Sequence, residues 1–159
     1  MLTDEQIAAL LAEPKRVVTD PLSSLRRKGA HLEATAKVAA DSNADFRVVV
    51  RVSTVNPHNF SVILMHRPRG GVWLRLRRYN GRSHFHTNRL EGNRFYAYHI
   101  HTATERYAAT GGADLESYAE ATDRYADYRG AYRCLLRDCG FGGPGPDDGQ
   151  LSLFPEEDE

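Results

Sequence analysis

Four short segments rich in β-branched and aromatic residues follow one another along the first half of the chain. They cover His31–Ala39, Phe46–Val55, Phe60–Arg67 and Val72–Tyr79, and clusters of Asn, Asp, Gly and Pro separate them. Segments of this length and residue type are typical of β-strands, and the residues between them are typical of tight turns. The sequence therefore predicts an antiparallel meander sheet.

Helices are expected before and after this sheet. Thr3 can cap a first helix that ends before Pro14, and the run from Thr102 can open a second, short one. Apolar residues at helical spacing predict a long helix over Leu115–Asp138, which would cover the apolar sheet face. The predicted fold class is thus α+β: an antiparallel meander sheet of five to six strands, with an N-terminal helix and a long C-terminal helix packed on one face.

The 159 residues fit one domain, and 41% of them are hydrophobic. Residues 1–141 are expected to form this single α+β domain, and the Gly-, Pro- and acid-rich residues 142–159 to form a disordered acidic tail with a short linear motif. No apolar run approaches the roughly 18 residues of a membrane span, so no membrane partner is expected. Met1–Gln6 lacks the features of a signal peptide, which favours a cytoplasmic location.

The net charge of zero argues against a basic coat over the whole protein. The average hides a local excess, however. Residues 67–94 contain eight arginines and one acidic residue, Glu91. The local field of this segment matters more than the total charge.

Two turns in the middle of the chain predict how the later strands pair. If Asn80-Gly81 and Gly92-Asn93 are both two-residue hairpin loops, His86 lies opposite His99. One sheet face then carries Trp73, Arg75, Arg77, Tyr79, Arg82, His84, His86, Asn88, His99 and His101. The opposite face carries Val72, Leu74, Leu76, Phe85, Thr87, Tyr98 and Ile100, and their apolar character favours the same register.

Histidines gathered on one face can act as acid and base, because imidazole changes charge near neutral pH. The candidate catalytic residues are His84, His86, His99 and His101. Arginines can hold a phosphate, and aromatic rings can stack on unpaired bases. The candidate substrate-binding residues are Arg75, Arg77, Arg82, Trp73 and Tyr79. This set predicts a metal-independent ribonuclease without a cofactor, with RNA or single-stranded nucleic acid as its partner.

The same four histidines, His84, His86, His99 and His101, also suit zinc or another late divalent ion. Arginines on the predicted face and the lack of a carboxylate there disfavour a bound dication, so zinc is the alternative cofactor. A third interpretation is structural, because a single histidine on a half-exposed strand is most often only a tolerated polar residue.

The tail contains one apolar island, Gln150-Leu151-Ser152-Leu153-Phe154. It resembles the bacterial sliding-clamp-binding motif, Gln-Leu-Ser/Asp-Leu-Phe, at every position. The resemblance implies that leucine and phenylalanine enter an apolar pocket of the clamp while the glutamine forms hydrogen bonds. The sliding clamp is therefore an expected partner, and a non-enzymatic module recruited to the clamp, binding nucleic acid or protein, is an alternative function. An incidental tail, or a strand that docks on its own domain, is the competing interpretation.

A longer run, Arg78–Tyr107, looks like an uncharacterised bacterial family with paired His-x-His strands that is associated with toxin–antitoxin or mobile-element neighbourhoods. This resemblance spans most of Phe46–Phe141 and implies a toxin or defence effector with a cognate antitoxin. The order helix, sheet, helix is also similar to the RelE and barnase type of small ribonuclease, whose catalytic sets include His, Arg, Lys and Tyr. No lysine lies near the predicted histidine face, so a lysine-dependent mechanism does not carry over.

Overall fold

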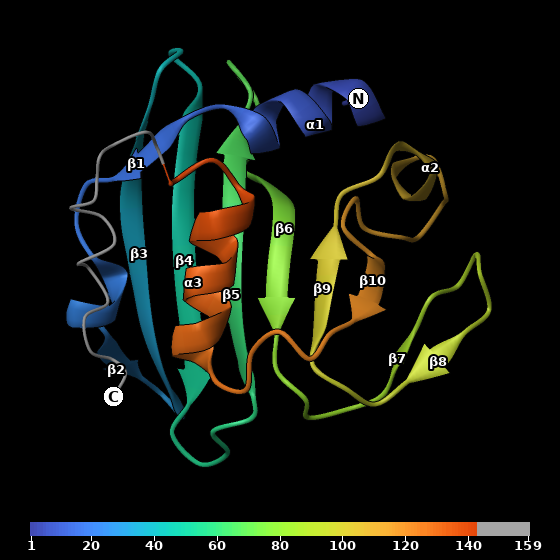
Figure 1. The fold of residues 1–159 in the computed structure, drawn as a ribbon. Helices are drawn as coiled ribbons and strands as arrows, with labels where there is room; N and C mark the ends of the chain where they lie inside the picture. The colour runs from blue at the N-terminus through green and yellow to red at the C-terminus, as the bar shows by residue number, and fades with distance from the viewer. Residues whose placement is uncertain (143–159) are drawn as a thin grey trace.

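The computed structural model describes residues 1–142, and the Gln150–Phe154 motif lies outside the described residues. A large antiparallel sheet has helices at both ends of the described chain (Figure 1). Its elements are α1 (Asp4–Ala12), β1 (Lys15–Val17), the 3-10 helix η1 (Pro21–Ser23), β2 (Arg26–Lys28), β3 (His31–Ala40), β4 (Asp45–Ser53), β5 (Phe60–Arg67), β6 (Leu74–Asn80), β7 (His86–Thr87), β8 (Arg94–Phe95), β9 (His99–Thr102), α2 (Glu105–Ala108), β10 (Tyr118–Ala121) and α3 (Tyr128–Asp138). The predicted α+β class is confirmed.

The first helix begins as predicted. The Thr3 side chain accepts a hydrogen bond from the Gln6 backbone N–H, and the Gln6 side chain accepts one from the Thr3 backbone N–H. The ammonium of Lys15 then donates to carbonyls at the end of α1 and to the carbonyl of Cys139, at the end of α3. Within residues 1–142, none of the helices has the length and apolar character needed to cross a membrane.

The main sheet follows the strand order β1-β3-β4-β5-β6-β9-β10, with β2 also paired to β3. Its eight strands exceed the five to six expected, and β7 and β8 form a separate two-stranded sheet. The long strands β3, β4 and β5 lie where the sequence predicts them, because their alternating apolar residues have one face to bury. The meander ends at β6, whose next neighbour is β9.

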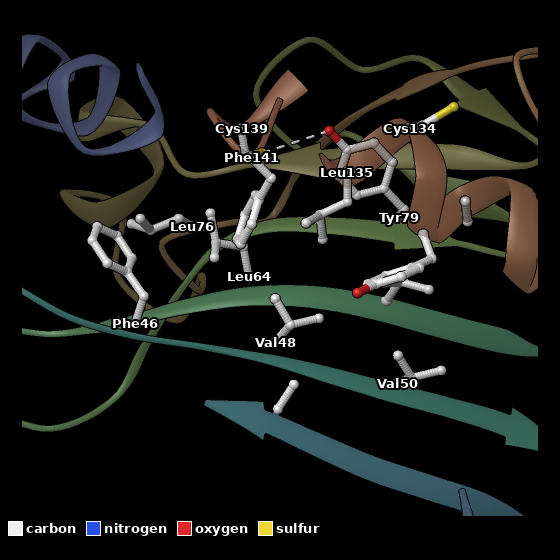
Figure 2. Close-up of a cluster of buried hydrophobic side chains, with 14 of the residues drawn as sticks. Phe46, Val48, Val50, Leu64, Leu76, Tyr79, Cys134, Leu135, Cys139 and Phe141 are labelled. Atoms are coloured by element: carbon white, nitrogen blue, oxygen red, sulfur yellow. Dashed lines mark hydrogen bonds between the residues drawn. The ribbon is translucent and has the colours of Figure 1, made fainter. Parts of the chain in front are cut away.

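Helix α3 packs on one face of this sheet, over β4, β5 and β6 (Figure 1). The core between them contains fully buried aliphatic side chains from the strands and the helix, among them Val48, Leu64, Leu76 and Leu135 (Figure 2). Tyr79 is also buried in this core, and its hydroxyl donates a hydrogen bond of 2.7 Å to Asp138 on α3. We call this side of the sheet the α3 face and the opposite side the far face.

The predicted helix over Leu115–Asp138 is wrong in its first half. Helix α3 begins only at Tyr128, where the Asp127 side chain accepts a hydrogen bond from the Gly130 backbone N–H. The residues before it include β10, which pairs along its length with β9. Sheet pairing thus overrides a helical spacing of apolar residues.

The predicted Asn80-Gly81 hairpin is also wrong. Gly81 continues beside the start of β5, where its N–H donates to the carbonyl of Phe60, and a Cβ at Gly81 would lie 1.9 Å from the carbonyl oxygen of His58. This glycine therefore serves a close backbone approach and not a two-residue turn. Strand β6 pairs with β9 instead, with Arg78 opposite His101.

The predicted register across Gly92-Asn93 is wrong as well. His86 lies opposite Phe95 in the β7–β8 pair, not opposite His99. The loop is longer than two residues: the Asn88 N–H donates to the Asn93 carbonyl and the Gly92 N–H to the Asn88 carbonyl, so that residues 89–92 form the turn. The hairpin of β7 and β8 lies beyond β10 at the end of the sheet (Figure 1).

A bulge in β6 decides which side chains reach each face. The β5–β6 register shifts between Leu64 and Met65, so that Leu76 and Tyr79 are both buried in the core although they are three residues apart. Arg77 lies 3.8 Å from Asp138 of α3 and thus belongs to the α3 face. The sequence prediction that Arg75 and Arg77 lie on the same face is therefore wrong.

Candidate metal centre

Three of the four predicted histidines converge at one place. His99 and His101 project from β9 on the far face, and His86 comes from β7. One ring nitrogen from each lies within 4.8 Å of the other two. The ring centroids are 4.9 Å apart for His86 and His101, 5.0 Å for His99 and His101, and 5.2 Å for His86 and His99.

Backbone carbonyls fix the ring tautomers of the two β9 histidines. His99 Nδ1 lies 2.8 Å from the carbonyl oxygen of Ala97, and His101 Nδ1 lies 2.8 Å from that of Glu116. A carbonyl can only accept, so each Nδ1 carries the hydrogen and each Nε2 keeps a lone pair. His99 Nε2 is buried and has no hydrogen-bond partner among residues 1–142.

Asn88 fixes the third histidine. Its Nδ2 donates to the Ala119 carbonyl at 2.8 Å and its Oδ1 accepts from the Ala119 N–H at 3.0 Å, which sets the orientation of the amide. The same Oδ1 lies 2.7 Å from His86 Nε2. His86 Nε2 must therefore donate, and His86 Nδ1 keeps the lone pair. Asn88 thus covers the outer edge of β10 and holds one histidine of the cluster.

Burial keeps the two β9 histidines neutral. The pKa of His99 is lowered to about 4, with desolvation by burial as the largest cause; the neighbouring histidines and Arg78 also lower it, whereas the hydrogen bond to Ala97 raises it. Desolvation likewise lowers the pKa of His101 to about 2, with Arg78 as the next cause. Neutral imidazole is the form that binds a metal ion, whereas a general acid must carry a proton.

A buried carboxylate lies beside the cluster. Glu116 is 2% exposed, and its Oε2 lies 3.5 Å from Arg75 and 3.4 Å from Arg78. Its backbone carbonyl is the one that holds His101. This carboxylate offsets one of the two positive charges of Arg75 and Arg78, which weakens the electrostatic argument against a bound dication.

The remaining predicted site residues are spread over the molecule. His84 is exposed, with its ring 6.3 Å from that of His99 and its Nδ1 hydrogen-bonded to Ser83. Arg82 lies over the ring of Tyr98 at 5.1 Å. Trp73 lies under the guanidinium groups of Arg47 and Arg67, as described below, while Tyr79 and Arg77 lie on the α3 face. The structure thus brings the histidines together and separates the predicted substrate-binding set.

The sequence prediction gave no role to Glu116 or Arg78. It placed Asn88 on the face of the histidines but gave it no function. Glu116 was hidden inside a predicted helix, and no local pattern marks it. The change of apolar phase between Leu76 and Tyr79 does carry a signal, because a regular strand would place these residues on opposite faces. Recognising that bulge would have put Arg78 on the face of the histidines.

Searches of protein-family models, of curated proteins and of solved structures found no match to this chain.

Proposed function

We propose that His86, His99 and His101 bind one divalent transition-metal ion, best suited to zinc, and that this ion serves hydrolytic chemistry. The observation that supports it most strongly is the buried Nε2 of His99, which has a lone pair and no hydrogen-bond partner among the described residues. A buried acceptor without a partner costs free energy unless something binds it. One ring nitrogen from each of His86, His99 and His101 lies within 4.8 Å of the other two.

The surroundings of the three imidazoles also fit a metal. Histidine ligands usually donate their second ring N–H to a carbonyl or carboxylate, which orients the ring. His99, His101 and His86 each do so, to Ala97, Glu116 and Asn88. Zinc–nitrogen bonds of about 2.0–2.1 Å require the ligand atoms to lie closer together than 4.8 Å. His86 is the half-buried member, on a two-residue strand, and has the most room to approach.

Three imidazoles with a fourth position left open are the ligand set of catalytic zinc sites, which activate water. His84 stands outside the three-residue set, which leaves the fourth position for a water molecule. Glu116 offsets one of the two positive charges of Arg75 and Arg78, which reduces the repulsion on a dication held close to them.

The metal-independent ribonuclease is less well supported by this geometry. It needs one histidine that is protonated near neutral pH, and the pKa values of His99 and His101, lowered to about 4 and about 2, leave only His84 and His86 for that role. Two of its phosphate-binding candidates, Arg77 and Arg82, lie away from the histidines. The nucleic-acid part of that hypothesis is independent of the metal and is taken up below.

Elemental analysis and titration with zinc test the proposal. The full chain, stripped with a chelator and dialysed, is expected to bind one equivalent of zinc, and cobalt in its place should give the visible spectrum of a tetrahedral nitrogen site. His99→Gln and His101→Gln should each lose this binding. His58→Gln is the matched control, because His58 is exposed and lies outside the cluster.

A wild-type chain that binds no zinc, or a His58→Gln variant that loses binding as fully as His99→Gln, would overturn the metal centre. RNA cleavage that persists in excess chelator and ends in a cyclic phosphate would instead support the metal-independent ribonuclease.

We also propose, on sequence alone, that Gln150–Phe154 binds a bacterial sliding clamp. The proposal rests on the match at all five positions of the motif. A peptide of the last fourteen residues should bind the purified clamp with roughly micromolar affinity, and the double change Leu153→Ala and Phe154→Ala should abolish it. Equal binding of both peptides would rule the motif out.

A further inference from the structure

The far face of β3 to β6 carries a strong excess of positive charge. Its basic residues are Lys37, Arg47, Arg51, Arg67, Arg75 and Arg78, and its acidic residues on the same strands are Glu33 and Asp45. We propose that this basic far face binds the phosphate backbone of a single-stranded nucleic acid. That this nucleic acid is also the substrate of the metal centre rests on the function proposed above. Its binding to the basic far face does not require the metal.

Two of the basic residues are left without a counter-charge. The carboxylates near the face are already paired, Glu33 with Arg51 at 3.6 Å, Asp45 with Arg67 at 3.0 Å, and Glu116 with Arg75 and Arg78. Lys37 and Arg47 form no ion pair within residues 1–142, although they lie directly opposite each other on β3 and β4. Like charges in this position repel, and an anion bound between them would remove the cost.

Arg47 also has an N–H group that lacks a hydrogen-bond acceptor. Its Nε is buried and has no hydrogen-bond acceptor among the described residues. Its guanidinium lies over the ring of Trp73 at 4.2 Å from the ring centre, with Arg67 over the same ring at 4.9 Å. A planar guanidinium held in this way presents its N–H groups in the geometry that suits phosphate.

Aromatic rings accompany the positive charge. Trp73 lies among the arginines, and the exposed rings of Phe85 and Tyr96 flank the hairpin that carries His86, with their centroids 5.2 Å apart. Basic residues interleaved with aromatic rings are how proteins bind single strands, whose bases are free to stack. A duplex hides its bases, and an acidic protein has none, so a single strand fits this combination best.

The basic face leads to the histidines. Arg78 on β6 lies directly opposite His101 on β9, on the same face. From β4, which carries Arg47, to β9 is three strand spacings, or about 14 Å. A strand of several nucleotides can therefore contact Arg47 and Trp73 and still place a phosphate at the metal centre.

Trp73 provides a direct test, because it is the only tryptophan in the chain. We expect a twenty-nucleotide oligo(dT) or oligo(U) to quench its fluorescence in buffer that contains chelator, with an affinity that falls as salt rises. The double variant Lys37→Gln and Arg47→Gln should bind about 10-fold more weakly, with a salt slope lower by roughly 1 to 1.5. The matched control, Arg129→Gln with Arg137→Gln, removes the same charge from α3 on the other side of the sheet.

Trp73→Leu, followed by the anisotropy of a labelled oligonucleotide, separates stacking from charge. It should weaken binding by about 5-fold or more and leave the salt slope unchanged. Equal losses in the far-face and α3 double variants, each checked for folding by circular dichroism, would overturn the proposal. So would binding of a duplex or of polyglutamate as tightly as of the single strand.

Because these measurements are made in chelator, they test the binding of the oligonucleotide independently of metal binding. His99→Gln is expected to keep its affinity for the oligonucleotide while it loses zinc. A chain that binds zinc but shows no quenching by either oligonucleotide would overturn the basic far face alone.

Discussion

Two regions of this sheet are held together in different ways. Strands β3, β4 and β5 are eight to ten residues long and pair along almost their whole length. Residues 82–127 contain strands of only two to four residues. There, side chains bond to backbone groups: Asn88 to Ala119, His101 to the carbonyl of Glu116, and the hydroxyl of Tyr107 to the N–H of Leu90.

The difference shows where a fold can accommodate a site. In β3 to β5 the buried side chains are apolar except for His66, and burial itself supplies the stability. In residues 82–127 the buried groups include Asn88, His99, His101 and Glu116, which must all find partners. Among the described residues of this region, His99 Nε2 is the buried side-chain atom that lacks a hydrogen-bond partner, and it is where we place the ligand. Stability and chemistry are thus assigned to different regions, and the predictions below test that separation.

The largest effect should come from the apolar region. Leu64 is fully buried between the sheet and α3, so Leu64→Ala should lower the free energy of unfolding by about 2–5 kcal/mol. It should leave the affinity for zinc unchanged, as measured by titration at a temperature where the variant is folded. His99→Gln should do the reverse, with a loss of zinc affinity beyond the roughly 10- to 100-fold caused by changes outside the ligand set. Parallel losses of stability and zinc in both variants would contradict the separation.

The same division explains what the sequence could predict. The capping box at Thr3 and the three long strands follow from local patterns, in which periodicity and propensity agree. Three of the four predicted histidines, His86, His99 and His101, lie together, but the register proposed for them was wrong. That register assumed regular alternation and two-residue turns, whereas the turn between Asn88 and Asn93 is longer and the β6 bulge shifts the phase.

Glu116 illustrates the limit of local pattern. Its contacts with Arg75 and Arg78 join residues about forty positions apart, and nothing in the flanking sequence indicates them. Leu115, Tyr118 and Tyr125 are spaced as in a helix, and only the pairing of β10 with β9 shows that this segment is extended. Contacts between residues far apart in the sequence therefore determine both the extended conformation of this segment and the position of the carboxylate beside the metal centre.

Acid should destabilise the histidine region selectively. In metal-free protein the pKa of His99 is lowered to about 4, whereas in the unfolded chain it is about 6.5. The contribution of neutral His99 is fully present above pH 6.5 and is lost as the pH falls toward 4, by up to about 3 kcal/mol. Denaturant unfolding at each pH, in chelator, should show a steeper decline for wild type than for His99→Gln. Identical slopes would mean that burial of His99 carries no such cost.

Two glycines distinguish a close approach from a turn. Gly81→Ala would place a Cβ 1.9 Å from the carbonyl oxygen of His58, so we expect a loss of up to about 3 kcal/mol. Gly92→Ala has open space around it but a φ of +82°, and should cost about 1 kcal/mol. Thermal unfolding of both variants measures the difference. A larger loss at Gly92 than at Gly81 would favour the hairpin that the sequence suggested.

Asn88 joins the two kinds of stabilisation in one side chain. Asn88→Ala leaves the N–H and carbonyl of Ala119 without partners and should cost about 1–3 kcal/mol. It also releases His86, so the affinity for zinc should fall by roughly 10- to 100-fold. These two losses arise from different atoms of the amide, which makes them separable.

Asn88→Asp separates them. A carboxylate can still accept from His86 Nε2 and from the Ala119 N–H, but it cannot donate to the Ala119 carbonyl. We therefore expect this variant to lose stability much as Asn88→Ala does and to keep most of its affinity for zinc, since carboxylate is a favoured partner of a ligating histidine. If zinc binding fell equally in both variants, the edge of β10 itself, and not the hydrogen bond to His86, would be what shapes the metal centre.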